Sequence, residues 1–522
     1  MNYADLFRVT LPESMLELAA LAVLIADLGL LRKASTQVRL AVAAVLGVLG
    51  CGAAAWMLQY SGTTGLAISS TGALILATGG AVTVAQAGIL ALTAVTLLLL
   101  FGTVFTRHVG EFVAVVLMAA TGGLLVAAAQ DLMVIFVGLE LLSLGLYILT
   151  AFAKSSEKSA EAALKYYLFG GMSAAFLLLG FSYLYGLTGA TNLTSIYTVL
   201  LQTGATQSPL FFVAVVAITA GLGFKVAAVP FHLWAPDTYE GAPAPAAAFI
   251  ASVSKIASFA LLLGFVLARA VAEGQSGALT GSLSGSLVGS LNGSLADGLR
   301  LASTARVVGL IFALAGASIV LGNLAALAQT SVRRLLAYSA IAHAGYILIG
   351  VGAALQANAQ PGANIQAVLY YALTYGLTTV GAFGVIGVVE QATGSDRLDA
   401  FLGLHKRSPI LAAVLFVLLL SLAGIPPLVG FWAKFNLFAA VLGQSGGVIP
   451  FVLVALALAA SAVSLYYYLQ VLKRAYVLPA IDERPIKTHP VVLVALVLIA
   501  TTVVLLGVLP SVLGDWIANL IG

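Results

Sequence analysis

Residues 221–245 read GLGFKVAAVPFHLWAPDTYEGAPAP, and this stretch decides the fold class. Its first half is as apolar as a helix that crosses lipid, yet Lys225 lies five residues before Pro230. Proline lacks a backbone N–H and breaks helices. Inside a bilayer, freed backbone groups survive only where protein or water satisfies them. The stretch therefore predicts a membrane helix with a functional interruption, beside which His232 also lies.

A second stretch repeats this combination. Residues 420–435 read LSLAGIPPLVGFWAKF, with Lys434 seven residues after Pro427 and eight after Pro426. Interrupted membrane helices commonly line the binding sites of transporters. Two interrupted helices, each with a lysine near the break, predict two half-channels that meet near the middle of the membrane.

The composition places these helices in lipid. Of the 522 residues, 61% are hydrophobic and only 8% are charged, whereas soluble domains average roughly 25% charged residues. The apolar runs are long and continuous, which excludes the alternating pattern of a membrane barrel. We therefore expect an all-α polytopic membrane protein with about fourteen spans. These lie near 12–31, 40–58, 82–105, 111–129, 132–152, 162–186, 209–235, 242–268, 306–328, 335–355, 364–390, 408–440, 448–472 and 490–513.

The basic residues predict the orientation. With fourteen spans, sixteen of the 23 lysines and arginines fall on the side opposite the N-terminus. Four fall on the N-terminal side, namely Arg8, Arg269, Arg300 and Arg306. Cytoplasmic loops carry the excess of positive charge. We therefore expect a multi-pass protein of the bacterial inner membrane with both termini on the periplasmic side.

The sequence lacks the motifs of cofactor binding, nucleophilic catalysis and nucleic-acid binding. The single cysteine, Cys51, excludes an iron–sulfur cluster ligated by cysteines of this chain alone. The five histidines are far apart, and there is no phosphate-binding glycine loop, nucleophile elbow or basic run for nucleic acid. We expect no cofactor, metal or catalytic residue within this chain.

The remaining three basic residues, Lys225, Lys255 and Lys434, lie within spans, as does Glu140. An ionised group at the bilayer centre costs about 2.5–3.5 kcal/mol on insertion scales, so such residues usually mark ion or proton pathways. We predict Glu140 and Lys225 as a proton-loading pair and Lys434 as the exit-side site.

Lys255 and His343 are predicted relay groups, and His232 is a further candidate. Each residue also has a structural alternative. Glu140 and Lys225 could be a static ion pair, Lys434 a structural partner and Lys255 a snorkelling side chain. Each histidine could be a satisfied core residue.

A weak internal repeat supports two transporter halves. Tyr166–Tyr167 and Tyr370–Tyr371 are 204 residues apart, as are Gly180 and Gly384. Five spans separate the two segments, and an odd number reverses orientation, as in inverted repeats. We expect three N-terminal spans in 1–110, repeats in 111–268 and 306–475, and a last span in 476–522. The glycine-dense stretch 274–298, within 269–305, predicts a flexible loop.

These motifs resemble the antiporter-like, proton-pumping membrane subunits of respiratory NADH–quinone oxidoreductase (complex I), with subunit N as the nearest match. The segments that carry the resemblance are 136–149 (FVGLELLSLGLYIL), 221–245, 254–259 (SKIASF), 322–350 (GNLAALAQTSVRRLLAYSAIAHAGYILIG) and 420–435.

The resemblance implies fourteen helices with two inverted five-helix repeats, and a polar axis at Glu140, Lys225, Lys255 and Lys434. His343 matches the family histidine of span 10. It also implies that NADH, FMN, iron–sulfur clusters and quinone bind to other subunits, and that the partners are other membrane-arm subunits. The shared motifs leave open a multi-subunit cation/proton antiporter or a membrane-bound hydrogenase-type complex.

Overall fold

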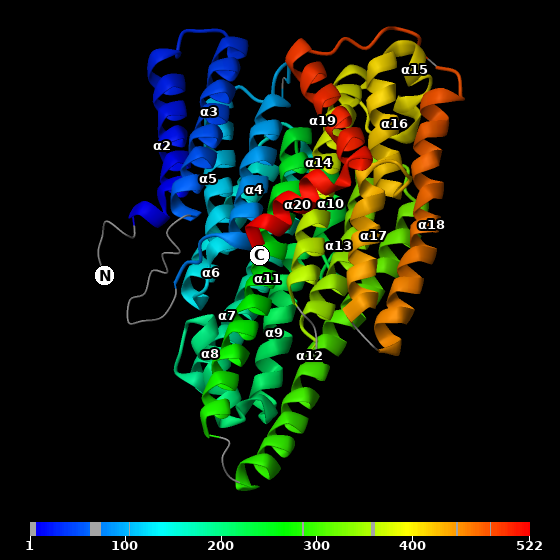
Figure 1. The fold of residues 1–522 in the computed structure, drawn as a ribbon. Helices are drawn as coiled ribbons and strands as arrows, with labels where there is room; N and C mark the ends of the chain where they lie inside the picture. The colour runs from blue at the N-terminus through cyan, green and yellow to red at the C-terminus, as the bar shows by residue number, and fades with distance from the viewer. Residues whose placement is uncertain are drawn as a thin grey trace.

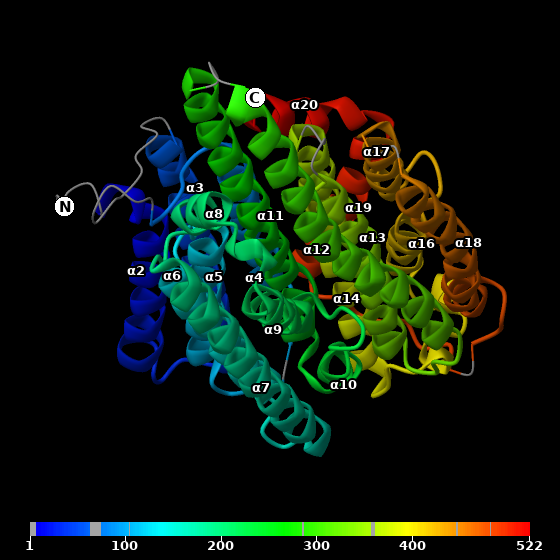
Figure 2. The ribbon, with the colours of Figure 1, turned by 90° about the horizontal axis from the view of Figure 1, so that it is seen from below.

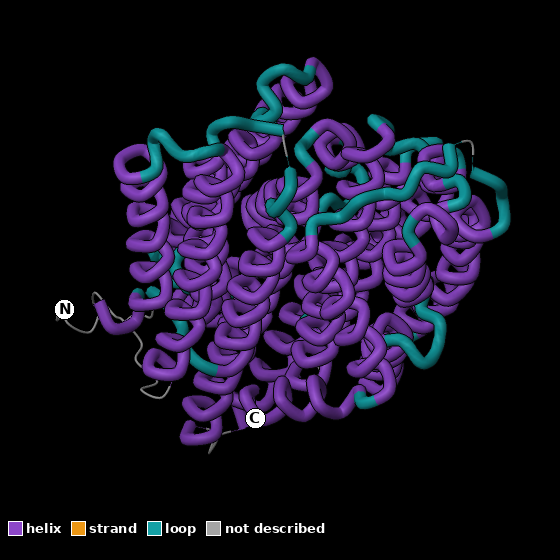
Figure 3. Tube along the Cα trace, turned by 90° about the horizontal axis from the view of Figure 1, so that it is seen from above, coloured by secondary structure: helices purple, strands orange, loops and turns teal. Residues whose placement is uncertain are grey.

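The computed structural model describes residues 7–62, 75–103, 105–283, 287–356, 361–444, 447–480 and 482–521. These residues form helices that run side by side in one bundle (Figure 1), and the helices are joined by loops (Figure 3). Within those ranges, extended residues pair only in isolated bridges, such as Asp131 with Asn192. The predicted all-α architecture is confirmed.

Within the described ranges, twelve helices are long and apolar enough to cross a membrane. They are α3 (Thr36–Gly62), α4 (Gly80–Leu98), α5 (Val109–Ala128), α6 (Leu132–Thr150), α7 (Glu157–Thr188), α9 (Pro209–Val226), α11 (Ala244–Leu283), α12 (Leu287–Leu327), α13 (Val332–Ala354), α14 (Pro361–Thr393), α18 (Val448–Tyr476) and α19 (Pro490–Val508). Two shorter apolar helices, α16 (Pro409–Ala423) and α17 (Val429–Gln444), occupy the predicted twelfth span.

The other elements are shorter. They are α2 (Leu11–Ile25), η1 (Ala26–Leu30), α8 (Leu193–Thr203), η2 (Ala205–Gln207), α10 (Trp234–Gly241), η3 (Leu398–Phe401), α15 (Leu404–Arg407) and α20 (Pro510–Ile521). Helix α2 continues directly into η1, so the first predicted span is helical from residue 12 to residue 30.

The predicted last span extended too far. It was placed at 490–513, but α19 ends at Val508 and α20 starts at Pro510. Proline suits the first turn of a new helix, where its missing N–H is not needed. In Figure 1, α20 runs across the bundle, where Gln366 of α14 donates to the carbonyl of Gly514 at 3.0 Å.

The centre of the bundle is formed by α11, α13 and α14. Helices α2 and α3 lie at one edge and α16 to α18 at the opposite edge (Figure 2). In the apolar 18-residue stretch of α13, 94% of the residues are buried, whereas in that of α18 only 28% are. A long helix buried on all sides suits the centre of a membrane protein, so Lys255 on α11 and His343 on α13, both buried, are far from lipid.

Two helices are interrupted at matching places. Helix α9 ends where Ala227 adopts a left-handed conformation (φ 59°), and α16 ends at Gly424 (φ 88°). The N–H of Ala228 bonds to the carbonyl of Gly223 at 2.8 Å, and that of Ile425 to the carbonyl of Leu420 at 3.1 Å. This is the Schellman-type ending of a helix. The predicted interruptions are confirmed, but each begins three residues before its cis-proline, Pro230 or Pro427.

The prediction of a flexible loop at 274–298 was wrong. Helix α11 continues to Leu283 and α12 begins at Leu287, and both project beyond the bundle (Figure 1). Each glycine costs a helix about 1 kcal/mol relative to alanine. However, extending an existing helix requires no new nucleation, so two spans can propagate through glycine-rich sequence.

Deletion of residues 276–296 is expected to leave the turnover of the protein near the wild-type value. The described parts of the deleted segment, 276–283 and 287–296, lie beyond the bundle (Figure 1), whereas the three lysines within the spans are buried. Turnover would be measured in membrane vesicles, normalised to the amount of the protein in the membrane. A large loss of turnover at normal assembly would show that the projecting helices take part in function.

Candidate functional site: buried lysines at two helix ends

Lys225 is in the last turn of α9 and is 8% exposed. Its Nζ donates a hydrogen bond to the hydroxyl of Ser143 on α6, and lies 5.5 Å from the centre of the Phe224 ring. The last turn of a helix favours a cation because the helix dipole is negative there. The end of α9 therefore partly offsets the cost of holding this ammonium in the membrane.

Lys255 connects the end of α9 to α13. Its Nζ donates to the carbonyl of Ala340 at 2.7 Å and lies 3.4 Å from the carbonyl of Val226, the last residue of α9. The side chain is 3% exposed. The break in α9 frees the carbonyl of Val226 from its helical partner, so Lys255 uses an acceptor that an unbroken helix would not offer.

His343 lies one turn after Ala340 on α13, between the two lysines of α11 and α17. Its Nδ1 is 2.8 Å from the hydroxyl of Tyr371, and the ring of Tyr375 lies 4.8 Å away. It is near enough to Lys255 and Lys434 to interact electrostatically with both. A histidine so placed can pass a proton between neighbours.

Lys434 repeats the arrangement of Lys255 at the second break. Its Nζ donates to the carbonyl of Ala423, the last residue of α16, at 2.8 Å, and to Ser461 of α18 at 2.6 Å. Tyr346 presents its ring 5.5 Å from the same nitrogen. Val226 and Ala423 are the last residues of the two matching helix ends. Each helix end thus has its final carbonyl bound by an ammonium group.

Glu140 and Lys225, which were predicted to form a pair, are not in direct contact. Among the described residues, no ion pair within 4 Å joins them, and Lys225 instead donates to Ser143, one turn further along α6. The two still interact electrostatically. Glu140 is half-buried on a face of α6 whose other residues, Met133, Val137, Leu144 and Ile148, are at least 50% exposed. The carboxylate therefore points partly outward, and this geometry separates it from the ammonium.

His232 and the three prolines lie in the connections between helices. His232 precedes α10 and is 7% exposed, and its Nδ1 has no hydrogen-bond partner in the part of the chain that the structure describes. Pro230 lies between α9 and α10, and Pro426 and Pro427 lie between α16 and α17. Nothing brings His232 into hydrogen-bond contact with the buried lysines.

Helix α10 is held by a group of ion pairs. Asp237 accepts from Lys165 of α7 at 2.8 Å and from Arg334 of α13 at 2.5 Å. Glu240 accepts from Arg334 and from Lys158, each at 3.1 Å. The two carboxylates of α10 thus pair with basic side chains of two other helices, and the group joins α7, α10 and α13.

A polar cavity of about 590 Å³ lies beside this group of ion pairs. Glu240, Arg333, Glu390 and Asp396 are among the charged residues that line it. Arg333 is 3% exposed and pairs with Glu390 at 3.1 Å. A cavity of this size and polarity can hold several waters. Of the charged groups named above, it is lined by members of the ion pairs and not by Lys225, Lys255 or Lys434.

Sequence reasoning missed the neutral partners of the charges, which are the hydroxyls of Ser143, Ser461 and Tyr371 and the two helix-end carbonyls. For Tyr371, the signal was present in the repeated tyrosine pair. For metals, no group of three or more His, Cys, Asp or Glu residues that could hold an ion occurs within the described ranges.

Comparison with known proteins shows the family of the chain. The family model described as "NADH:quinone oxidoreductase/Mrp antiporter, TM" matches residues 129–300 and 295–460. NADH-quinone oxidoreductase subunit N 2 of Acidobacterium capsulatum is 44% identical over 99% of both chains. The chain therefore belongs to the NADH:quinone oxidoreductase/Mrp antiporter family of membrane subunits.

Solved structures have the same fold. A chain of respiratory complex I from Thermus thermophilus, solved with bound aureothin, is 31% identical and has a TM-score of 0.74. The match covers 97% of this chain and 98% of that one. A chain of the Mrp complex from a Dietzia species is 21% identical, with a TM-score of 0.76, covering 98% of this chain and 97% of that one. At that identity the likeness is one of fold alone.

Proposed function

We propose that this chain is a proton-translocating membrane-arm subunit of an NADH:quinone oxidoreductase. Electron transfer from NADH to quinone takes place in other subunits, which bind NADH, FMN, the iron–sulfur clusters and quinone, and this chain carries no cofactor. The observation that carries the proposal is the pair of matched helix ends, where Lys255 and Lys434 bind the final carbonyls of α9 and α16.

The proton-carrying groups are Glu140, Lys225, Lys255, His343 and Lys434. A lysine ammonium is a donor with no acceptor capacity, and becomes neutral when its proton leaves. A carbonyl at a helix end stabilises the charged form, and desolvation in the membrane interior favours the neutral form. A small movement of either helix end would change this balance. Such a lysine can therefore take up and release a proton within one cycle.

These five groups form a row, and electrostatic coupling would pass a change in charge from one group of the row to the next. Moving Glu140 away from Lys225 weakens the attraction of that carboxylate on the ammonium, so its proton leaves more readily. The proton would pass by way of Lys255 and His343 toward Lys434, which lies on the far side of the row. The polar cavity lined by Glu390 and Arg333 would supply the protons.

The internal symmetry is proposed to be that of two inverted five-helix repeats within fourteen transmembrane helices. On this count, α2 with η1 forms the first span, α9 with α10 the seventh, and α16 with α17 the twelfth. Support comes from the two helix ends and from matched backbone pairs. The N–H of Leu132 bonds to Thr191 and that of Val332 to Asp396, each at 2.9 Å. The repeats would occupy 111–268 and 306–475, after three N-terminal spans and before one last span.

The partners are other membrane-arm subunits and the lipid bilayer. A carboxylate on an apolar outer face is costly in lipid, so the face of α6 that holds Glu140 favours cover by a neighbouring subunit. The excess of basic residues supports an orientation with both termini on the periplasmic side of the bacterial inner membrane.

An affinity tag on this chain is expected to purify a complex that oxidises NADH and reduces quinone. Inverted membrane vesicles containing it should acidify when NADH is added, because proton uptake and release are coupled to that reaction. A complex without NADH oxidation, whose vesicles exchange sodium or potassium for protons, would instead identify a cation/proton antiporter. Co-purification with hydrogenase subunits would likewise overturn the proposal.

A further inference from the structure

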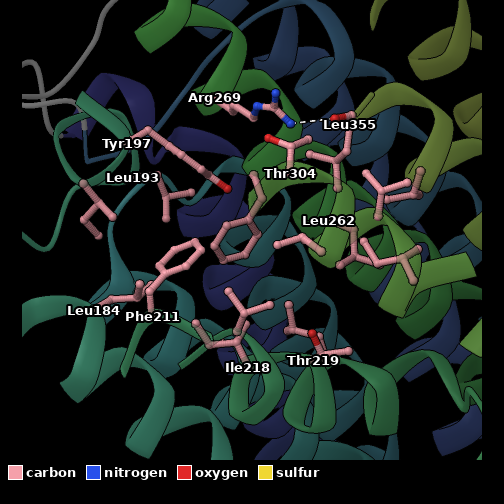
Figure 4. Close-up of a pocket in the computed structure, with 18 of the residues that line it drawn as sticks. Leu184, Leu193, Tyr197, Phe211, Ile218, Thr219, Leu262, Arg269, Thr304 and Leu355 are labelled. Carbon is pink, nitrogen blue, oxygen red and sulfur yellow. Dashed lines mark hydrogen bonds between the residues drawn. The ribbon is translucent and has the colours of Figure 1, made fainter. Parts of the chain in front are cut away.

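An apolar cavity lies away from the row of lysines, between α8, α9, α11 and α12 (Figure 4). Its volume is about 180 Å³, and its walls include Leu193, Phe211, Ile218 and Leu262. A cavity of about 150 Å³ with such a lining stays dry and holds a benzene ring. The cavity therefore suits a segment of hydrocarbon and does not suit a chain of waters.

Polar groups gather at one end of the cavity. Arg269, Tyr197 and Thr304 lie together there (Figure 4), and Leu262 lies away from them. Arg269 is seven residues beyond Leu262 on α11, which corresponds to about 10 Å along a helix. The site is thus apolar in its depth and charged at its rim, which matches an amphiphile that lies along the helices.

The charged rim consists of an arginine and a glutamate. Arg269 Nη1 donates to the carbonyl of Leu355 at 2.5 Å, and its Nε donates to Glu273 at 2.9 Å. The side chain of Glu273 is 44% exposed, against 14% for Arg269. Nη2 also lies 2.9 Å from a carboxylate oxygen of Glu273. These contacts use three of the five N–H donors of the guanidinium, and two remain. The rim therefore presents both a donor for an anion and an exposed acceptor for a cation.

The cavity adjoins a surface that faces lipid. On α9, Val215 lines the cavity while the next residue, Val216, is 41% exposed. Leu210, Phe212 and Val213 of the same helix are also 43–48% exposed. An outer apolar face on a membrane-crossing helix contacts acyl chains. A chain from that layer can enter the cavity without crossing a polar boundary.

We propose that this cavity binds one acyl chain of a zwitterionic, amine-bearing phospholipid. The phosphate lies against Arg269 and the ammonium against Glu273. Arginine pairs with phosphate through directed N–H donors, and Glu273 matches a primary ammonium. A purely anionic headgroup would bring its negative charge beside Glu273 without a compensating cation. The site thus selects phosphoethanolamine over phosphoglycerol headgroups.

The test uses the intact complex in detergent micelles with two probes. One is phosphatidylethanolamine with a photoactivatable diazirine in its acyl chain, and the other is the matching phosphatidylglycerol. Peptide mass spectrometry locates the labelled residues. We expect phosphatidylethanolamine to label the cavity segments around Ile218 and Leu262. Val215→Phe, which fills the cavity, should reduce that labelling at least about tenfold, whereas Val216→Phe on the lipid side should leave it unchanged.

Two charge variants test the headgroup assignment. Arg269→Gln should reduce labelling by both probes, and Glu273→Gln should remove the preference for phosphatidylethanolamine while labelling persists. Equal labelling in Val215→Phe and wild type, or no label in the cavity segments, would overturn the site. Equal labelling by the two probes in the wild type would overturn the assignment of a phosphoethanolamine headgroup. Labelling is read without NADH or proton transport, so these results are independent of the proposed function.

Discussion

Lys225→Ala is expected to lower NADH-driven proton translocation in inverted vesicles by about tenfold or more, which corresponds to at least ~1.4 kcal/mol. The change removes a buried ammonium that donates to Ser143 and lies at the end of α9. No nearby group replaces it, because Lys255 is already bound to Ala340 and Val226. Initial rates of acidification, normalised to assembled complex, provide the measurement.

The Lys225→Arg variant distinguishes a lysine that carries protons from a lysine that only supplies a fixed positive charge. Arginine keeps a positive charge and hydrogen-bond donors but does not deprotonate in proteins. A proton-carrying Lys225 predicts that the arginine variant pumps as poorly as the alanine variant, and a structural ion pair predicts recovery. Lys154→Ala, at an exposed lysine outside the row, is the matched control and should pump normally. Wild-type pumping in Lys225→Ala would remove Lys225 from the mechanism.

Glu140→Gln is expected to reduce proton translocation severalfold while the complex still assembles. Glutamine keeps the size and polarity of the side chain but not its negative charge. Because Glu140 makes no direct ion pair with Lys225, its loss should weaken electrostatic control of that lysine and disturb packing little. The ratio of protons moved to NADH oxidised measures the effect, and native gels of membranes report assembly.

Glu140→Asp is the matched variant, because it restores the charge on a shorter side chain and should recover part of the proton-to-NADH ratio. If the glutamine variant fails to assemble, Glu140 holds the subunit against a neighbour and its charge is structural. If it pumps with the normal ratio, the carboxylate lies outside the coupling pathway. Either result would leave the roles of Lys255 and Lys434 to be tested separately.

The buried charges were predictable because each one is an exception within an apolar run. Lys225, Lys255 and Lys434 are identified residue by residue, since the cost of burying a charge in lipid belongs to the side chain itself. The helix interruptions were also predictable, because proline and glycine themselves determine where a regular helix ends. The loop prediction at 274–298 was wrong because it gave the local glycine content more weight than the long helices on either side.

What each charge binds could not be read from the sequence. Every residue offers a carbonyl, and only the left-handed turns after Val226 and Ala423 leave those two open to an ammonium group. Ser143 and Ser461 resemble many other serines in the chain until α6 and α18 pack beside the lysines. The separation of Glu140 from Lys225 likewise follows from how α6 is rotated against its neighbours.

The sequence by itself determined that this is a helical membrane protein with amines buried near two broken helices. Those properties follow from the free energy of transferring each side chain from water to lipid, which is local. The tertiary structure alone decided which carbonyl, hydroxyl or ring meets each amine, and where an apolar cavity remains beside Arg269. The hydrogen bonds of the three amines join residues 11–85 positions apart, so they depend on how whole helices pack.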